Sequence, residues 1–175
     1  GRLLYPGEEI IQVSLGSGHS SALTSEGRIF TWGGNSHGQL GDGTITNRYT
    51  PIDITSLFDL NRDETIIQVS LGSSHSSALS SKGRIFTWGY NEHGQLGDGA
   101  ITERHTPTEI TSQFILTGDE TIVQVSLDGQ TTSALSSEGR VFIWGGNSHG
   151  QLGDGTTTDI ITPTEAASQF GLNEG

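Results

Sequence analysis

The chain repeats itself with a period of 56 residues. The segment WGGNSHGQLGDG begins at Trp32 and returns unchanged at Trp144, while the similar WGYNEHGQLGDG begins at Trp88. Units 8–63 and 64–119 differ at 15 of 56 positions, so 41 positions are identical. Such a period is typical of repeat architectures, in which each unit is completed by packing on its neighbours. The closeness of the copies favours recent duplication or deliberate construction.

Dividing the chain at Glu8 gives three units and a short leading segment. The units are 8–63, 64–119 and 120–175. The leading segment, 1–7, reads GRLLYPG and resembles GRIFTWG of the first unit in its glycine, arginine and apolar positions. We therefore expect three structural repeats, with 1–7 as a strand that completes one of them at a junction.

Within each unit the apolar residues alternate as they do in short β-strands. The segment IIQVSL at 10–15 places Ile11, Val13 and Leu15 on one face. Further strands are expected at 19–25, 27–34 and 50–54, the last at a sheet edge because it contains Pro51. The segment 54–60 forms at most one helical turn. The pattern predicts an all-β fold of β-propeller blades, with three four-stranded blades per chain.

The glycine-rich segment after each tryptophan connects the third strand to the fourth. Its glycines allow turns with positive φ. Asn35 and Asp42 can hydrogen-bond nearby backbone amides, His37 and Gln39 can reach the adjoining unit, and Leu40 is expected to point inward. One tryptophan per unit at the same phase indicates packing of the blades. We therefore assign structural roles to Trp32, Trp88, Trp144, Gln39, Gln95, Gln151, Asp42, Asp98 and Asp154.

The same segment also contains residue types that hydrolases and metalloproteins use. Ser36, His37 and Asp42 are the types of a catalytic triad, but the second unit carries Glu92 where the first has its serine. Zinc would need ligands at ~2.0–2.3 Å, which equivalent histidines on different blades do not offer. The GDG segments lack the alternating carboxylates of a calcium loop. We expect no catalytic residue, no metal and no cofactor. The equivalent histidines are His37, His93 and His149.

Composition narrows the class of partner. The formal net charge is −12, from 20 acidic and 8 basic residues, which is the wrong sign for binding nucleic acid or anionic lipid. The chain has no cysteine, so disulfides and thiolate metal sites are excluded. We expect neither a membrane span nor a signal peptide, because no apolar run approaches the ~20 residues of a span and the amino end lacks a charged and apolar leader. The compartment stays open.

Several motifs together give a resemblance to a known family. Each unit carries a G-R-apolar-aromatic-x-W-G strand followed by N-x-x-G-Q-L-G and T-P, and the first reads SLGSGHSSAL. Over residues 8–175 the chain resembles the family of regulator of chromosome condensation repeats. The resemblance implies a propeller of four-stranded blades, usually seven, that acts as a protein-binding platform. The founding member is a chromatin-bound guanine-nucleotide exchange factor for a small GTPase, and a bacterial relative inhibits β-lactamases.

Two features depart from the family pattern. Three units are too few to close a ring, since propellers have about 4–8 blades. In the third unit Asp128 replaces a glycine, and Thr131 replaces the histidine present at His19 and His75. If those histidines join neighbouring blades, the third unit has a different junction or faces an end. We predict that two chains close a six-bladed ring as a homodimer; a nine-bladed trimer and a fragment of a longer chain are the alternatives.

Positions that vary between otherwise matching units mark what the fold does not require. They gather in and after the glycine-rich segment, which should form one rim of the propeller. Exposed aromatic residues favour interfaces, so Tyr90 is the candidate anchor for a partner, although neutral surface drift explains the variation equally well. The candidate partner-binding rim consists of Asn35, Ser36, His37, Tyr49, Tyr90, Glu92, His93, His105, Ser148 and His149.

Taken together, these observations predict a non-enzymatic scaffold of near-identical propeller repeats that associates with itself and binds another protein. The alternative is a regulatory factor of guanine-nucleotide exchange type acting on a small GTPase. That alternative comes from the resemblance alone, because no residue here can be matched to an exchange site.

Overall fold

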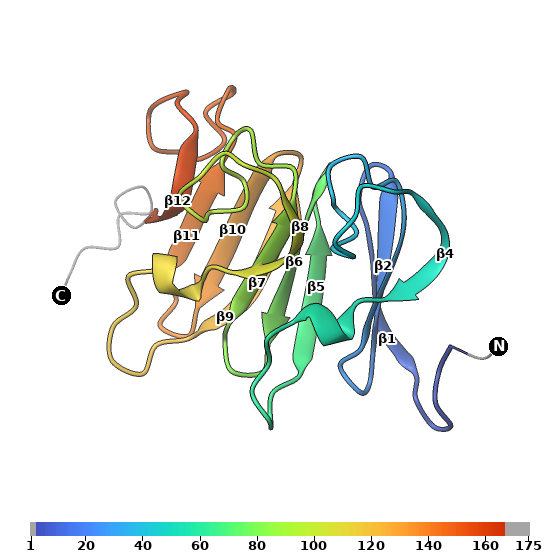
Figure 1. Ribbon diagram of the computed structural model, residues 1–175. Coiled ribbons are helices and arrows are strands. Elements are labelled where there is room, and N and C mark those ends of the chain that lie inside the picture. The colour runs from blue at the N-terminus through green and yellow to red at the C-terminus, as the bar shows by residue number, and fades with distance from the viewer. Residues whose placement is uncertain (1–2, 167–175) are drawn as a thin grey trace.

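The chain folds into three four-stranded antiparallel sheets, each with its strands in chain order (Figure 1). This computed structural model describes residues 3–166. Blade 1 consists of β1 (Ile10–Leu15), β2 (His19–Thr24), β3 (Ile29–Gly33) and β4 (Arg48–Asp53). Blade 2 consists of β5 (Ile66–Leu71), β6 (His75–Ser80), β7 (Ile85–Gly89) and β8 (Arg104–Glu109). Blade 3 consists of β9 (Ile122–Asp128), β10 (Thr131–Ser136), β11 (Val141–Gly145) and β12 (Ile160–Glu165).

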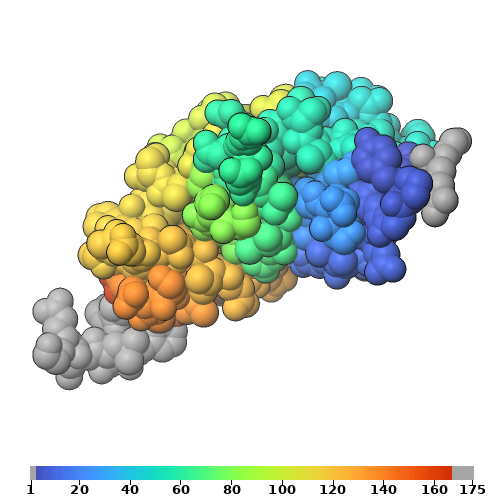
Figure 2. All heavy atoms as spheres, turned by 90° about the horizontal axis from the view of Figure 1, so that it is seen from below, coloured from blue at the N-terminus to red at the C-terminus, as the bar shows by residue number. Residues whose placement is uncertain are grey.

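The three blades stand side by side in one row. The first strand of blade 2, β5, contacts both β1 and β9. Figure 2 shows an elongated body with blade 1 at one end and blade 3 at the other. The prediction of three four-stranded blades is therefore confirmed. Among residues 3–166, no helix has the length and apolar character needed to cross a membrane.

The outer strands and the short helices lie where the sequence predicted them. Pro51 lies in β4, which pairs only with β3 and so forms a sheet edge that needs no donor from this residue. A single 3-10 turn follows in each of the first two units, η1 (Thr55–Leu57) and η2 (Thr111–Gln113). The equivalent of Phe58 and Phe114 in the third unit, Phe170, lies outside the described residues.

The simple alternation predicted for the first strand is wrong at its start. The register between β1 and β2 shifts between Ile10 and Gln12, and β5 contains the same irregularity. A β-bulge places two residues opposite one and so changes the face of those before it. In blade 2, Ile66 therefore shares the buried face with Val69 and Leu71, whereas Ile67 is 51% exposed.

The leading residues form a turn. Residues 3–7 contain no strand, and Glu8 N donates to Tyr5 O over 3.1 Å. Arg28 Nη1 donates to Leu3 O, just as Arg84 Nη1 donates to Asp59 O one period later. The described part of the leading segment thus takes the place of the end of a preceding unit, without completing a blade as a strand.

The hydrophobic core lies between the blades. We call the face of a blade that corresponds to the side of blade 2 packed on blade 3 its trailing face, and the opposite face, packed on blade 1 in blade 2, its leading face. At the first junction the trailing face supplies Leu23, Ile29, Ile54 and Phe58, and the leading face supplies Ile66, Val69, Leu71, Ala78, Phe86 and Trp88. The second junction repeats this set one period later. A single unit therefore contributes half of two cores, and its stability depends on its neighbours.

Candidate interaction surfaces

A glutamine in the first strand of blade 1, and its equivalent in blade 2, bind the backbone of the next blade. Gln12 Nε2 donates to Val69 O over 2.8 Å, and Gln12 Oε1 accepts from Val69 N over 3.0 Å. Leu71 N donates to Ser14 Oγ in the same strand pair. Gln68 makes the equivalent pair of bonds to Val125. Sequence reasoning missed this role; the available signal was a glutamine that recurs in an apolar strand in all three units.

A buried histidine and a tryptophan complete each junction. Trp88 Nε1 and Ser76 Oγ both donate to the carbonyl of Gln39, over 2.9 and 2.8 Å. The single hydroxyl hydrogen of Ser76 is used there, so His19 Nε2 donates to Ser76 Oγ over 3.0 Å. The second junction has the same arrangement, with His75 bonded to Thr132. Trp88 and Trp144 therefore pack between blades, and the preceding blade accepts the indole N–H of each.

Burial holds both junction histidines neutral. The pKa of His19 is lowered to about 4 by burial, and the pKa of His75 is lowered to about 3 by burial and by the nearby His19. The hydrogen bonds require a proton on Nε2, while Nδ1 of each ring is buried without a hydrogen-bond partner that would stabilise a second proton. Protonation therefore opposes packing of the blades.

The glycine-rich segment is organised by its asparagine. Asn35 Oδ1 accepts from Leu40 N over 2.9 Å, and Nδ2 donates to the carbonyls of Thr44 and Thr46. Leu40 points inward and is fully buried, as predicted. Asn35 itself is fully buried, so its placement on the partner-binding rim was wrong: it holds the loop from inside. The recurrence of the residue at Asn91 and Asn147 was the sequence signal for this role.

The two residues expected to bridge neighbouring units do so differently. Gln39 reaches the next blade through its backbone carbonyl, while its side-chain Oε1 accepts from His37 N. His37 does bridge, since Nδ1 lies 2.5 Å from Glu103 Oε1 of blade 2. His93 repeats the contact with Asp159 of blade 3 over 2.7 Å.

The residue types of a hydrolase are present but not assembled. His37 faces Glu103, whereas the carboxylate of Asp42 binds Arg48 Nε over 2.7 Å and accepts from Thr44 N. The first aspartate therefore stabilises its own loop, as Asp98 does with Arg104. Within residues 3–166, no group of three or more His, Asp or Glu side chains is arranged to hold a metal ion.

The remaining rim residues form a partly exposed surface across the blades. The ring of Tyr90 lies 4.7 Å from that of His37 and 6.2 Å from that of His93, which links the loops of blades 1 and 2. Tyr90 OH donates to Glu92, and this hydrogen bond raises the pKa of Tyr90 to about 12. Half-buried rim residues are His37, Tyr90 and His93; exposed ones are Ser36, Tyr49, Glu92, His105, Ser148 and His149.

The leading face of blade 1 has no blade packed against it among the described residues. Val13 is 62% exposed, whereas its equivalents Val69 and Val125 are 0% and 1% exposed. Trp32 is half-buried, unlike the fully buried tryptophans of the other two units. An apolar hollow on this blade is lined by Leu3, Leu4, Ile10, Ala22, Phe30, Trp32 and Pro51.

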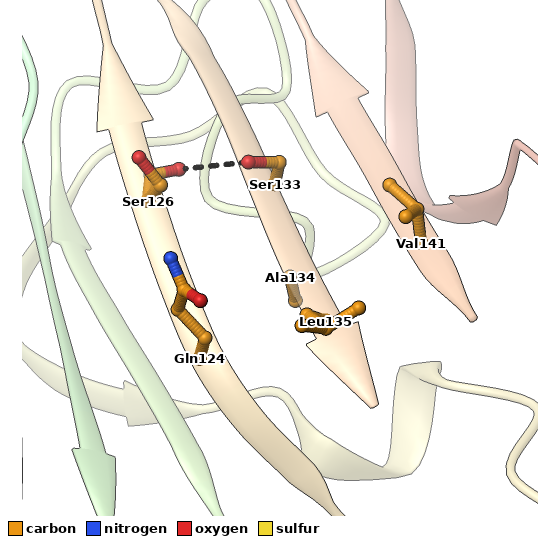
Figure 3. Close-up of a pocket in the computed structure, with 6 residues that line it drawn as sticks. All are labelled: Gln124, Ser126, Ser133, Ala134, Leu135 and Val141. Carbon is orange, nitrogen blue, oxygen red and sulfur yellow. Dashed lines mark hydrogen bonds between the residues drawn. The ribbon is translucent and has the colours of Figure 1, made fainter. Parts of the chain in front are cut away.

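Among residues 3–166, nothing packs on the trailing face of blade 3 as blades 2 and 3 pack on the trailing faces of blades 1 and 2. Figure 3 shows Gln124 and Ser126 of β9 beside Ser133 and Leu135 of β10, lining a hollow with Val141 of β11. Leu135 and Val141 are half-buried here, although their equivalents in blades 1 and 2 are buried in the junction cores. The two ends of the row thus present the two halves of a junction.

Comparison with known proteins agrees with this geometry. The model of the regulator of chromosome condensation (RCC1) repeat matches residues 26–79, 82–135 and 138–171. A second model with the same description matches 10–39, 66–95 and 122–151. The chain belongs to the RCC1 repeat family. The predicted resemblance is therefore confirmed, and the structure explains the repeat motifs as contacts within loops and across junctions.

The relatives are longer proteins. The chain is 36% identical over 165 residues to the human probable E3 ubiquitin-protein ligase HERC3. These residues make up 94% of this chain and 15% of HERC3. Human WBSCR16 matches in structure with a TM-score of 0.73 and 29% identity, over 90% of this chain and 39% of the other. Prp20p from Saccharomyces cerevisiae, whose binding to Gsp1p and histones has been described, matches with a TM-score of 0.70 and 21% identity. That match covers 89% of this chain and 38% of Prp20p.

Proposed function

We propose that the chain is a non-enzymatic protein-interaction module whose blades join end to end, with a second copy completing the ring. The observation that carries this proposal is the complementarity of the two open ends. Apart from the turn of blade 3 that holds Asp128 and Thr131, each end carries, among residues 3–166, the residue types that form the internal junctions, and the covered copies of those residues are buried. Exposed apolar faces and strand edges of this kind favour association.

The internal junctions indicate how the copies would meet. Gln124 and Ser126 stand where Gln12 and Ser14 bind the next blade, so they would bond the backbone around Val13 of the second copy. Trp88 and Trp144 donate to the backbone carbonyls of Gln39 and Gln95 at the internal junctions, so Trp32 of the second copy would donate to the carbonyl of Gln151. Two copies give six blades, within the usual range of about 4–8, whereas three copies would exceed it.

Solution mass tests ring closure directly. We expect light scattering at micromolar concentration to give twice the 18.5 kDa of one chain. Val13→Asp would place a charge in the new junction and should return the protein to a monomer. Ile101→Asp is the matched control, because Ile101 is similarly exposed, at 61%, but lies in a loop of blade 2. A monomeric wild type, or dissociation by both variants alike, contradicts the proposal.

The rim is the surface we assign to a partner of another kind. It spans loops of all three blades, contains the aromatic ring of Tyr90, and varies between units whose frameworks are nearly identical. The net charge of −12 suits a basic partner. Nucleotide-exchange activity on a small GTPase is the alternative. A nucleotide-release assay separates the two, since a passive binding module leaves the release rate at its background value.

A further inference from the structure

The third unit departs from the other two over residues 128–132, around the turn between its first two strands, and two of these positions face each other across that turn. Blades 1 and 2 have Gly16 with His19 and Gly72 with His75, whereas blade 3 has Asp128 and Thr131. In each pair the two residues stand opposite each other across the turn: Gly16 N donates to His19 O, and Thr131 pairs with Asp128 in the sheet register. The two replacements therefore lie at one place on the trailing face.

The two positions are coupled by space. A Cβ atom added to Gly16 would overlap Cε1 and Nδ1 of His19, and one added to Gly72 would overlap the same atoms of His75. The imidazole therefore keeps its present position in the junction only while the opposite residue is glycine. Asp128 accordingly stands opposite a short side chain. The hydroxyl of Thr131 donates to Gly146 O over 3.0 Å, inside its own blade.

This pair removes contacts that both internal junctions have. In those junctions the imidazole donates across to Ser76 or Thr132. The turns also touch through the backbone, since Ser73 N donates to Gly129 O over 2.9 Å. A Cβ at Gly16 would lie 2.6 Å from Gly72 O of the next blade. Asp128 would bring such an atom, and a carboxylate, against the turn of any blade docked in the same way.

We propose that Asp128 and Thr131 weaken the junction formed by the trailing face of blade 3, so that the second copy is held less tightly than the blades within a chain hold one another. This inference rests on the proposed ring closure for its partner. The apolar and glutamine contacts of that face remain, while the imidazole bond and the close approach of the turns are lost. The ring therefore opens between chains and not within them.

Reversal of the pair is the first test. Asp128→Gly with Thr131→His restores the internal type of junction, and we expect it to tighten dimerisation about a hundredfold, or about tenfold at each of two junctions. Thr131→His alone should give no gain, because its imidazole meets the Cβ of Asp128. Sedimentation velocity over a dilution series measures the dissociation constants. If Thr131→His alone binds as tightly as the double variant, or if the double variant gains nothing, the inference is wrong.

Transfer of the pair into an internal junction tests the same inference without a second copy. We expect Gly72→Asp with His75→Thr to lower the melting temperature by about 3 °C, from the loss of one buried hydrogen bond. Gly72→Asp alone should lower it further, because the imidazole is still present. A double variant as stable as the wild type, or no more stable than Gly72→Asp alone, overturns the inference. If wild type and reversed variant are both monomeric, ring closure is wrong, and the transfer experiment still decides what the pair does to a junction.

Discussion

Acidification should loosen the junctions before it affects the carboxylates. His19 and His75 have pKa values of about 4 and about 3 in the folded chain, against an ordinary value of 6.5. The unfolded chain therefore binds more protons than the folded chain throughout the window from about 6.5 down to these values. Stability from the neutral imidazoles is complete above pH 6.5 and is lost as the pH falls below it.

The size of the effect follows from the same values. One pKa unit corresponds to about 1.4 kcal/mol, and pH 5 lies about 1.5 units below the ordinary histidine value. Each buried histidine should thus lower the free energy of unfolding by about 2 kcal/mol between pH 7.5 and pH 5, or about 4 kcal/mol for both. Carboxylates titrate mainly below this window, because their ordinary pKa values lie near 4.

Urea unfolding followed by tryptophan fluorescence at pH 7.5 and pH 5 measures this difference. The matched control is His19→Gln with His75→Gln, in which an amide N–H replaces the imidazole donor but does not titrate. We expect the control to be less stable at pH 7.5 and to lose about 4 kcal/mol less than the wild type on acidification. All other side chains are the same in the two proteins, so their contribution to the pH dependence cancels. An equal pH dependence in the two proteins would refute the assignment of the effect to the junctions.

Two further predictions concern single hydrogen-bonding groups. Trp88→Phe removes the indole donor to Gln39 O and should cost about 1–3 kcal/mol in urea unfolding. At a protein concentration low enough to keep the chain monomeric, Trp32→Phe should cost distinctly less, because no blade covers Trp32 within the chain. Equal losses in the monomer would contradict a junction role for the indole. Asn91→Ala leaves Leu96 N without its acceptor and should lower the free energy of unfolding by about 1–3 kcal/mol. Glu92→Ala beside it is the control and should change this free energy by less than about 0.5 kcal/mol. An equally small effect of Asn91→Ala would show that the loop is held by its glycines alone.

The period and the alternation were enough to predict the blades. Four short strands per unit, an edge strand with Pro51 and an inward Leu40 all follow from local pattern, because each depends on neighbouring residues in one unit. The bulge before Gln12 could not be predicted in this way. A bulge is not visible in the pattern of apolar residues along a strand, because it changes only which residues of the neighbouring strand they pair with.

Contacts between units were the harder part. Gln39 was expected to reach the next unit through its long side chain, but its backbone carbonyl makes the bond between the blades. Every residue has a backbone carbonyl, so the residue type could not indicate this bond. Asn35 accepts a hydrogen bond from a nearby backbone amide as expected, but its place on the partner-binding rim was wrong, because the side chain that makes this bond is buried inside the loop. Comparison of the three units with one another held the better signal, since polar residues that bind the next blade, such as Gln12, recur in all of them.

Because the apolar core lies at the boundaries between blades, the natural unit of change in this chain is a whole period. Recombination between equivalent codons of two units would delete or add one blade, and every surviving boundary would still join a trailing face to a leading face of nearly the same sequence. Lineages carrying such an array can therefore alter the number of blades in a single genetic event, with no compensating substitutions in the interior.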